Sequence, residues 1–204
     1  MHLLDRRLLG VTILLLLVLL VVVKRAATGS ILDKPSGEAP VQLVNVFNLF
    51  FLLVVNPAVA VTLAIGRVPA IDPTYLPIDR TWARITLEIV GLVTYVSGFL
   101  LMAWALITLR RNYQLGGSVP RLGDRMVTDG PYRTIRHPMY TAALSIALGL
   151  SCLIQSLALA CVFGIYAILI LRLIPVEEEG LRKAYGERYV NYREATRSLI
   201  PLIY

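Results

Sequence analysis

The chain has 204 residues, of which 57% are hydrophobic and 16% are charged. Soluble globular domains average roughly 45–50% apolar and ~25% charged residues, so this balance excludes an ordinary soluble domain, a disordered chain and a fibrous repeat. It indicates a protein that faces lipid, and the formal net charge of +7 is therefore no sign of a nucleic-acid partner.

The first apolar segment covers residues 8–23, where only Gly10 and Thr12 interrupt a run of Leu, Val and Ile. This length is close to the ~17–25 residues that a membrane-spanning helix needs. A signal peptide is the alternative, but Lys24 and Arg25 follow the run where a cleavage site of small residues would be expected. We therefore expect a first transmembrane helix that the protein retains.

Two longer segments predict the second and third spans. Residues 41–66 contain no charge, and residues 85–109 contain only Glu88. Each is long enough for one tilted helix across the bilayer.

The next uncharged stretch, residues 139–171, is too long for one span, because a single helix of that length would overshoot the ~30 Å hydrocarbon core. Dividing it near Gln155 predicts spans at 139–154 and 157–174, joined as a tight helical hairpin. The predicted fold class is thus all-α: a polytopic integral membrane protein of one domain (residues 1–204), with five transmembrane helices. We expect Pro175 to end or kink the fifth, and a C-terminal interfacial helix to follow it.

The basic residues predict how the spans are oriented. With the N-terminus outside, 14 of the 20 Lys and Arg lie in cytoplasmic segments, against five on the other side and Arg172 in the last span. Cytoplasmic segments carry the excess of Lys and Arg, so the N-terminus is predicted outside and the C-terminus and site inside. The 14 are Lys24, Arg25, Lys34, Arg110, Arg111, Arg121, Arg125, Arg133, Arg136, Arg182, Lys183, Arg188, Arg193 and Arg197.

Residues 130–140 crowd two tyrosines, two arginines and His137 immediately before the fourth span. A positively charged, aromatic flank of a membrane helix is the simpler explanation. However, Gly130-Pro131 predicts a rigid turn and Pro138 a helix start, so these polar groups are expected to gather where the helix meets water.

Three acids, Glu177, Glu178 and Glu179, follow the fifth span. The alternative explanation is that acidic residues are favoured in the first turn of an interfacial helix by the helix dipole. The predicted hairpin nevertheless returns the chain to the side of His137, so at least one acid is expected beside it. An arginine, an acid and tyrosines together suit a zwitterion that also carries a sulfonium or an aromatic base.

The motifs resemble a known family. Gly130-x-Tyr132-x-x-x-Arg136-His137-Pro138-x-Tyr140, followed by Glu177-Glu178 and by Tyr185-Gly186-x-x-Tyr189-x-x-Tyr192, resembles the integral-membrane isoprenylcysteine carboxyl methyltransferase family; phospholipid methyltransferases share a looser pattern. The likeness covers residues 122–201. It implies a membrane enzyme that uses S-adenosyl-L-methionine, releases S-adenosyl-L-homocysteine and methylates a lipophilic or prenylated substrate among membrane lipids.

The resemblance also implies a site made of two segments, residues 122–140 and 175–192. Its cofactor-binding positions are Asp124, Arg125, Met126, Val127, Tyr132, Arg136, His137, Pro138, Met139, Tyr140, Glu177 and Glu178. The family's arginine for the substrate carboxylate falls here on Leu173, so the neighbouring Arg172 becomes the candidate clamp. Snorkelling of Arg172 to the interface is the alternative.

A carboxylate or thiolate acceptor arrives already anionic, so methyl transfer to it requires no general base. This makes His137 a candidate for holding or positioning the cofactor. An amine acceptor would need deprotonation, with His137 or Glu177 as candidates.

Two other functions fit parts of the pattern. NADPH-dependent membrane sterol reductases share Arg-His-Pro-x-Tyr, but Met139, Thr141 and the Glu177-Glu178 pair argue against that class. A non-catalytic scaffold or transporter would place polar residues face to face at mid-membrane, with Asn45, Asn48, Asn56 and Glu88 as candidates. We expect those four to make hydrogen bonds between helices instead. Cys152 and Cys161 lie in apolar stretches without ligand spacing, so we expect no metal site and two buried thiols.

Overall fold

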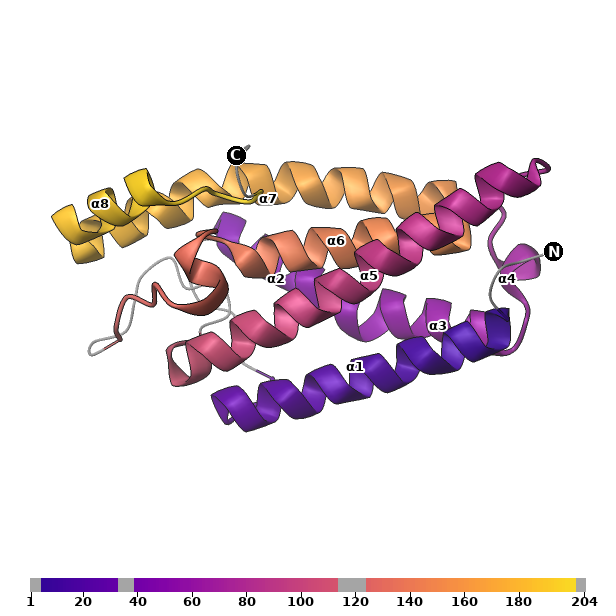
Figure 1. Cartoon of the computed structure of the whole chain (residues 1–204), viewed down its shortest axis with the longest axis horizontal. Helices are drawn as coiled ribbons and strands as arrows, with labels where there is room; N and C mark the ends of the chain where they lie inside the picture. The colour runs from indigo at the N-terminus through magenta and orange to yellow at the C-terminus, as the bar shows by residue number, and fades with distance from the viewer. Residues whose placement is uncertain (1–4, 33–38, 114–123, 201–204) are drawn as a thin grey trace.

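The computed structural model describes residues 5–32, 39–113 and 124–200, which form helices and two isolated β-bridges without a strand. Long helices run side by side along one axis of the molecule (Figure 1). Within the described ranges, four helical stretches are long and apolar enough to cross a membrane, and a shorter apolar helix lies among them. The predicted fold class, an all-α polytopic membrane protein, is confirmed. The main helices are α1 (Arg6–Thr28), α5 (Thr81–Leu109), α6 (Pro138–Ile154), α7 (Leu157–Tyr185) and α8 (Glu187–Ala195).

The second crossing is a single path through α2 (Ala39–Phe50), a π-helical turn (Phe51–Val55) and α3 (Asn56–Ala64). Pro57 explains the widened turn, because proline has no N–H to donate and its ring crowds the carbonyl four residues earlier. Beside it, the hydroxyl of Tyr95 on α5 donates to the buried Asn56 Oδ1 at 3.0 Å. The hydrogen bond between helices predicted for Asn56 is therefore confirmed.

Glycines let α5 and α6 pack closely. A Cβ on Gly149 of α6 would lie 2.5 Å from the backbone nitrogen of Tyr95 and 2.8 Å from the carbonyl oxygen of Gly91, both on α5. A Cβ on Gly98 would lie 2.9 Å from the carbonyl oxygen of Ala142 on α6. Because glycine has no Cβ, the two backbones can approach closely at these positions. Close van der Waals packing of this kind holds helices together in lipid, where the hydrophobic effect does not drive their association.

The predicted hairpin turn joins α6 to α7. Gln155 adopts a positive φ of 59°, and the hydroxyl of Ser156 caps α7 by accepting from the N–H of Leu159 at 3.2 Å. The loop that follows α4 (Val68–Ile71) braces this turn, since the N–H of Leu76 donates to the carbonyl of Gln155 at 2.8 Å and the N–H of Leu157 to the carbonyl of Thr74 at 3.1 Å.

Pro175 does not end the helix, contrary to one of the two outcomes expected for it. Helix α7 continues through Pro175 to Tyr185, and the exposed proline leaves only the carbonyl four residues earlier without its helical donor. The chain breaks instead at Gly186, whose φ of 56° favours glycine, and α8 follows. Glu177 and Glu178 therefore stand on a continuous helix.

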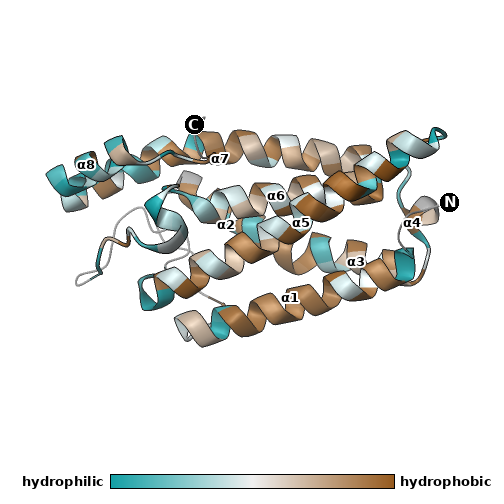
Figure 2. Ribbon diagram, viewed as in Figure 1, coloured by the Kyte–Doolittle hydropathy of each residue, from teal (hydrophilic) through white to brown (hydrophobic). Residues whose placement is uncertain are grey.

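Hydrophobic residues predominate along α1, along α5 and in the N-terminal part of α7, whereas hydrophilic residues gather at helix ends and on α8 (Figure 2). The expectation of two buried thiols is wrong, because Cys152 on α6 is half-buried and Cys161 is exposed on α7. That exposed surface is apolar, as befits a helix face turned toward lipid.

Candidate active site

Two short 3₁₀ helices lie in the described parts of the long segment between α5 and α6. Arg110–Asn112 continues α5, and Gly130–Arg133 leads into α6. The predicted turn at Gly130 is present: this residue has a φ of 55°, and a Cβ there would lie 2.6 Å from Oγ1 of Thr108. The chain then passes through Arg136 and His137, and Pro138 begins α6.

The C-terminal segment holds this entry to α6 in place. The backbone N–H of Arg136 donates to the carbonyl of Arg197 at 2.7 Å, and that of His137 donates to the carbonyl of Ser198 at 3.0 Å. In return, the N–H of Arg197 donates to the carbonyl of Thr134 at 3.1 Å. These backbone bonds satisfy donors that precede a proline-initiated helix.

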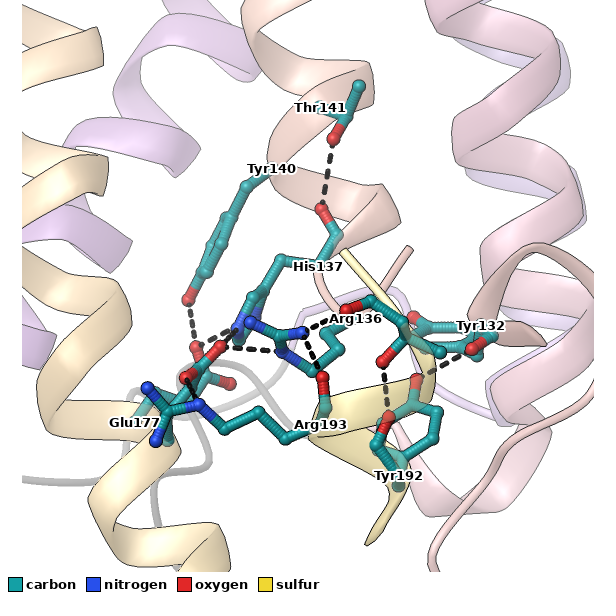
Figure 3. Close-up of polar contacts among 10 residues, drawn as sticks. Tyr132, Arg136, His137, Tyr140, Thr141, Glu177, Tyr192 and Arg193 are labelled. Atoms are coloured by element: carbon teal, nitrogen blue, oxygen red, sulfur yellow. Dashed lines mark hydrogen bonds and ion pairs between the residues drawn. The ribbon is translucent and has the colours of Figure 1, made fainter. Parts of the chain in front are cut away.

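Glu178 is the centre of a buried ionic cluster with Arg136, His137 and Arg193, and these three partners are labelled in Figure 3. Its Oε1 accepts from Nε of Arg136 at 2.8 Å and lies 3.2 Å from Nε2 of His137, and its Oε2 lies 3.4 Å from Nε of Arg193. Nη1 of Arg136 also donates to the carbonyls of Arg193 and Thr196, at 3.1 and 2.6 Å. The guanidinium of Arg136 thus ties α6, α7 and the end of α8 together.

Glu177 makes a different set of contacts. The Tyr140 hydroxyl donates to Glu177 Oε2 at 2.8 Å, and Nδ1 of His137 lies 3.7 Å from the same oxygen. The rings of His137 and Tyr140 stack with centroids 5.6 Å apart. The imidazole therefore lies between two carboxylates, one on each ring nitrogen.

Glu177 faces a cavity of about 300 Å³, and Glu178 does not line it. One part of the cavity wall is polar and aromatic, and includes Glu177, Tyr132, Tyr140, Tyr185, Tyr189 and Tyr192. Another part is apolar and comes from α1, the second crossing, α5 and α6; it includes Leu20, Val21, Leu49, Leu52, Leu53, Met102, Leu106 and Ala143. One continuous space thus combines groups for a polar ligand with a surface for an apolar one.

The tyrosines of the polar part remain neutral. Burial raises the pKa of Tyr132 well above its ordinary value, and burial likewise raises the pKa of Tyr189 and of Tyr192. The hydroxyl of Tyr192 donates to the carbonyl of Tyr132 at 2.6 Å, whereas the buried hydroxyl of Tyr189 has no hydrogen-bond partner among the described residues. Near neutral pH these groups are hydrogen-bond donors and ring faces, and none is a base.

The structure brings most of the predicted site residues together. Those that line the cavity are Asp124, Arg125, Met126, Val127, Tyr132, Arg136, His137, Met139, Tyr140 and Glu177. Residues 122 and 123 of the predicted segment, with Arg121 and Lys34 of the charge count, lie outside the described residues.

Three predicted residues do not line the cavity. Pro138 starts α6, and Glu178 is held in the ionic cluster behind the cavity. Arg172 is exposed, and the residue that turns inward from that part of α7 is Leu173. One residue along a helix turns by about 100°, so Arg172 as a carboxylate clamp needs a rearrangement of α7 that this structure does not contain.

The apolar part of the cavity includes polar residues that no motif identified. Asn45 and Asn48 on α2 line it, whereas only hydrogen bonds between helices were expected of them. Their spacing of three residues places them on one face of α2, whose remaining residues are apolar apart from Gln42, and this spacing is the sequence signal for a shared role.

Comparison with known proteins identifies the family. A family model described as phospholipid methyltransferase matches residues 87–188, half of the chain and the part that carries most of the site. The chain belongs to the phospholipid methyltransferase family. The predicted resemblance to the isoprenylcysteine carboxyl methyltransferases is confirmed by the similar proteins described next.

Two curated relatives match over part of their length. Protein-S-isoprenylcysteine O-methyltransferase B of Arabidopsis thaliana is 29% identical over 118 residues, which cover 55% of this chain and 58% of the relative. The cobalt-zinc-cadmium resistance protein CzcN of Cupriavidus metallidurans is 33% identical over 82 residues, or 40% of this chain and 38% of that protein. The match therefore spans about two fifths to three fifths of these relatives.

A solved structure shares the fold. It is the eukaryotic intramembrane Ras methyltransferase ICMT, matched with a TM-score of 0.54 and 20% identity over 80% of this chain and 74% of that one. At this identity the likeness concerns the arrangement of helices.

Proposed function

We propose that the chain is a membrane methyltransferase that uses S-adenosyl-L-methionine to methylate a lipophilic acceptor, with the carboxylate of a prenylcysteine-like lipid as the favoured class. The observation that carries this proposal is the single cavity in which Glu177, Tyr140 and other tyrosines face apolar side chains from several helices. Family membership favours it over the reductase and scaffold alternatives.

The residues on the polar side fit S-adenosyl-L-methionine. The Glu177 carboxylate has acceptor positions beyond the one that Tyr140 uses, and they suit an ammonium or ribose hydroxyls. The ring faces of Tyr132 and neighbouring tyrosines suit a sulfonium or an adenine. The Asp124–Val127 stretch supplies more of the wall. Bound there, the cofactor would supply an electrophilic methyl group on sulfur.

The chain's own residues position the groups that bind the cofactor, and they shield the cavity from water. His137 and Tyr140 hold Glu177 in place. Arg136 and Glu178 hold His137 in position, and neither has a proposed contact with the reacting groups. Apolar side chains such as Leu52 and Leu106 exclude water and hold the hydrocarbon part of an acceptor. A carboxylate acceptor needs no proton removed, which agrees with tyrosines that stay neutral.

The polar part of the cavity lies at the helix ends that we assign to the cytoplasmic side. Lys24 near the end of α1 and Tyr113 beyond α5 also line it, and the ammonium of Lys24 lies 5.1 Å from the ring centroid of Tyr113. We infer that a water-soluble cofactor enters from the cytoplasm and that a lipid acceptor enters from the bilayer.

Binding of S-adenosylhomocysteine to the detergent-purified protein tests the proposal. We expect it to raise the melting temperature and NADPH to leave it unchanged, because ligand binding to the folded state stabilises it. Glu177→Gln should weaken this binding at least about tenfold, since a charge-assisted hydrogen bond contributes roughly 1.5–3 kcal/mol. The control is Glu179→Gln, whose exposed carboxylate pairs, among the described residues, with Arg182 and Lys183. Equal stabilisation by NADPH, or full binding by Glu177→Gln, would contradict the cofactor assignment.

A further inference from the structure

Asn45 on α2 has a buried amide nitrogen that lacks a hydrogen-bond partner in the described part of the chain. Its side chain is 2% exposed, and its Nδ2 makes no hydrogen bond to any described residue. Removing an amide donor from water without replacing its hydrogen bond is unfavourable, so each such group in a native protein needs an explanation.

The position of Asn45 supplies that explanation, because it lines the cavity among apolar side chains. Phe47 and Phe51 on the same crossing contact the ring of Tyr166 on α7, with centroids 5.0 and 6.1 Å apart. These aromatic contacts fix the rotation of the crossing about its axis. Asn45 is thereby held toward the cavity, with Asn48 about one turn further along the same wall.

Two other buried amides show why the location matters. Asn56 also has an unpaired Nδ2, but its Oδ1 accepts from Tyr95 and it does not line the cavity. Gln155 lies at the turn between α6 and α7 and is likewise absent from the cavity wall. Of these three amides, Asn45 is the one that lines the cavity.

We propose that Asn45 determines acceptor specificity by donating a hydrogen bond from Nδ2 to an oxygen of the acceptor, with Asn48 as its neighbour. This inference rests on the proposed function and adds to it the chemistry of the acceptor. The favoured acceptor carries a carbonyl or carboxylate oxygen next to its hydrocarbon part. That hydrocarbon part would lie among Leu49, Leu52 and Met102, and the oxygen would accept from the Asn45 amide. A site built to hydrogen-bond such a group rejects molecules that lack it far more strongly than it rejects a missing methylene.

The test replaces the amide by an apolar side chain of nearly the same size. Asn45→Leu should raise the KM for N-acetyl-S-farnesylcysteine at least about tenfold, with kcat within about threefold and S-adenosylhomocysteine binding unchanged. Because the substitution removes a buried donor that has no partner, the melting temperature without ligand should stay the same or rise. The matched control is Asn56→Leu, which breaks the bond from Tyr95 and should lower the melting temperature without changing that KM.

A lowered melting temperature together with an unchanged KM in Asn45→Leu would overturn the inference, because the amide would then have a structural role only. If the wild-type protein transfers no methyl group, the proposed function fails, and acceptor binding still decides the role of Asn45. In that case N-acetyl-S-farnesylcysteine must raise the melting temperature of the wild type more than that of Asn45→Leu, and an equal rise would refute the inference.

Discussion

Glu177 and Glu178 show how one step along a helix separates two roles. The first faces the cavity and accepts from Tyr140, whereas the second is buried against Arg136, His137 and Arg193. His137 contacts both acids and so links the cavity wall to the ionic cluster. Of the motif residues, Glu177 is thus the proposed ligand contact, and Arg136 and Glu178 are proposed positioning residues.

Glu178→Gln is expected to destabilise the protein by about 2–3 kcal/mol, because breaking a buried ion pair leaves Arg136 without its carboxylate while the amide keeps one acceptor oxygen. The melting temperature in detergent measures this. Any loss of S-adenosylhomocysteine binding should be smaller than in Glu177→Gln. Stability equal to that of the wild type would contradict a structural role for this cluster.

At the residue scale, the sequence was most informative where motif residues are close in space. Ten of the twelve predicted cofactor positions line one cavity, because a proline-initiated helix and a helical hairpin place them together. The role of Arg172 could not be predicted in this way, because it depends on how α7 is rotated about its axis. For Asn45 the sequence predicted a hydrogen bond between helices, because composition does not say whether an amide faces a neighbouring helix or a cavity.

At the scale of elements, close packing of α5 on α6 sets the position of the Arg136–His137 segment. Gly91, Gly98 and Gly149 allow this packing, yet no short glycine motif marked them in the sequence. The sequence equally did not predict the pairing of residues 134–137 with residues 197–198, because backbone atoms alone join these segments, which lie about 60 residues apart. The apolar runs, by contrast, predicted the helices well, since length and hydrophobicity decide a membrane span.

Substituting Gly149 with alanine should separate α5 from α6 and lower stability. The added Cβ would lie 2.5 Å from the backbone nitrogen of Tyr95, and overpacking of this kind costs about 1–3 kcal/mol. Gly164→Ala on α7 is the control, because a Cβ there meets nothing within 4 Å. Melting temperatures of the two variants in the same detergent provide the comparison, and equal values would contradict close packing at Gly149.

At the scale of the whole molecule, the arrangement of basic residues leads to a prediction about orientation. In a background with Cys152 and Cys161 replaced by serine, Asp79→Cys should react with a membrane-impermeant maleimide added outside intact cells. Arg188→Cys on α8 should react only after the membrane is opened, because the positive-inside rule places it in the cytoplasm. Both parent residues are exposed, so access to the probe depends on the side of the membrane. The reverse labelling pattern would overturn the predicted topology.

The central claim is that the cavity brings an S-adenosylmethionine site and a lipid acceptor together. Its most direct test is transfer of tritium from methyl-labelled S-adenosylmethionine to prenylcysteine and membrane-lipid acceptors by the purified protein, followed by extraction into organic solvent and treatment with alkali. We predict a labelled product that alkali converts to volatile methanol, as a methyl ester requires, with at least about tenfold less product from Glu177→Gln. Organic-soluble label that survives alkali would contradict the carboxylate assignment, and no label above that of Glu177→Gln would contradict the central claim.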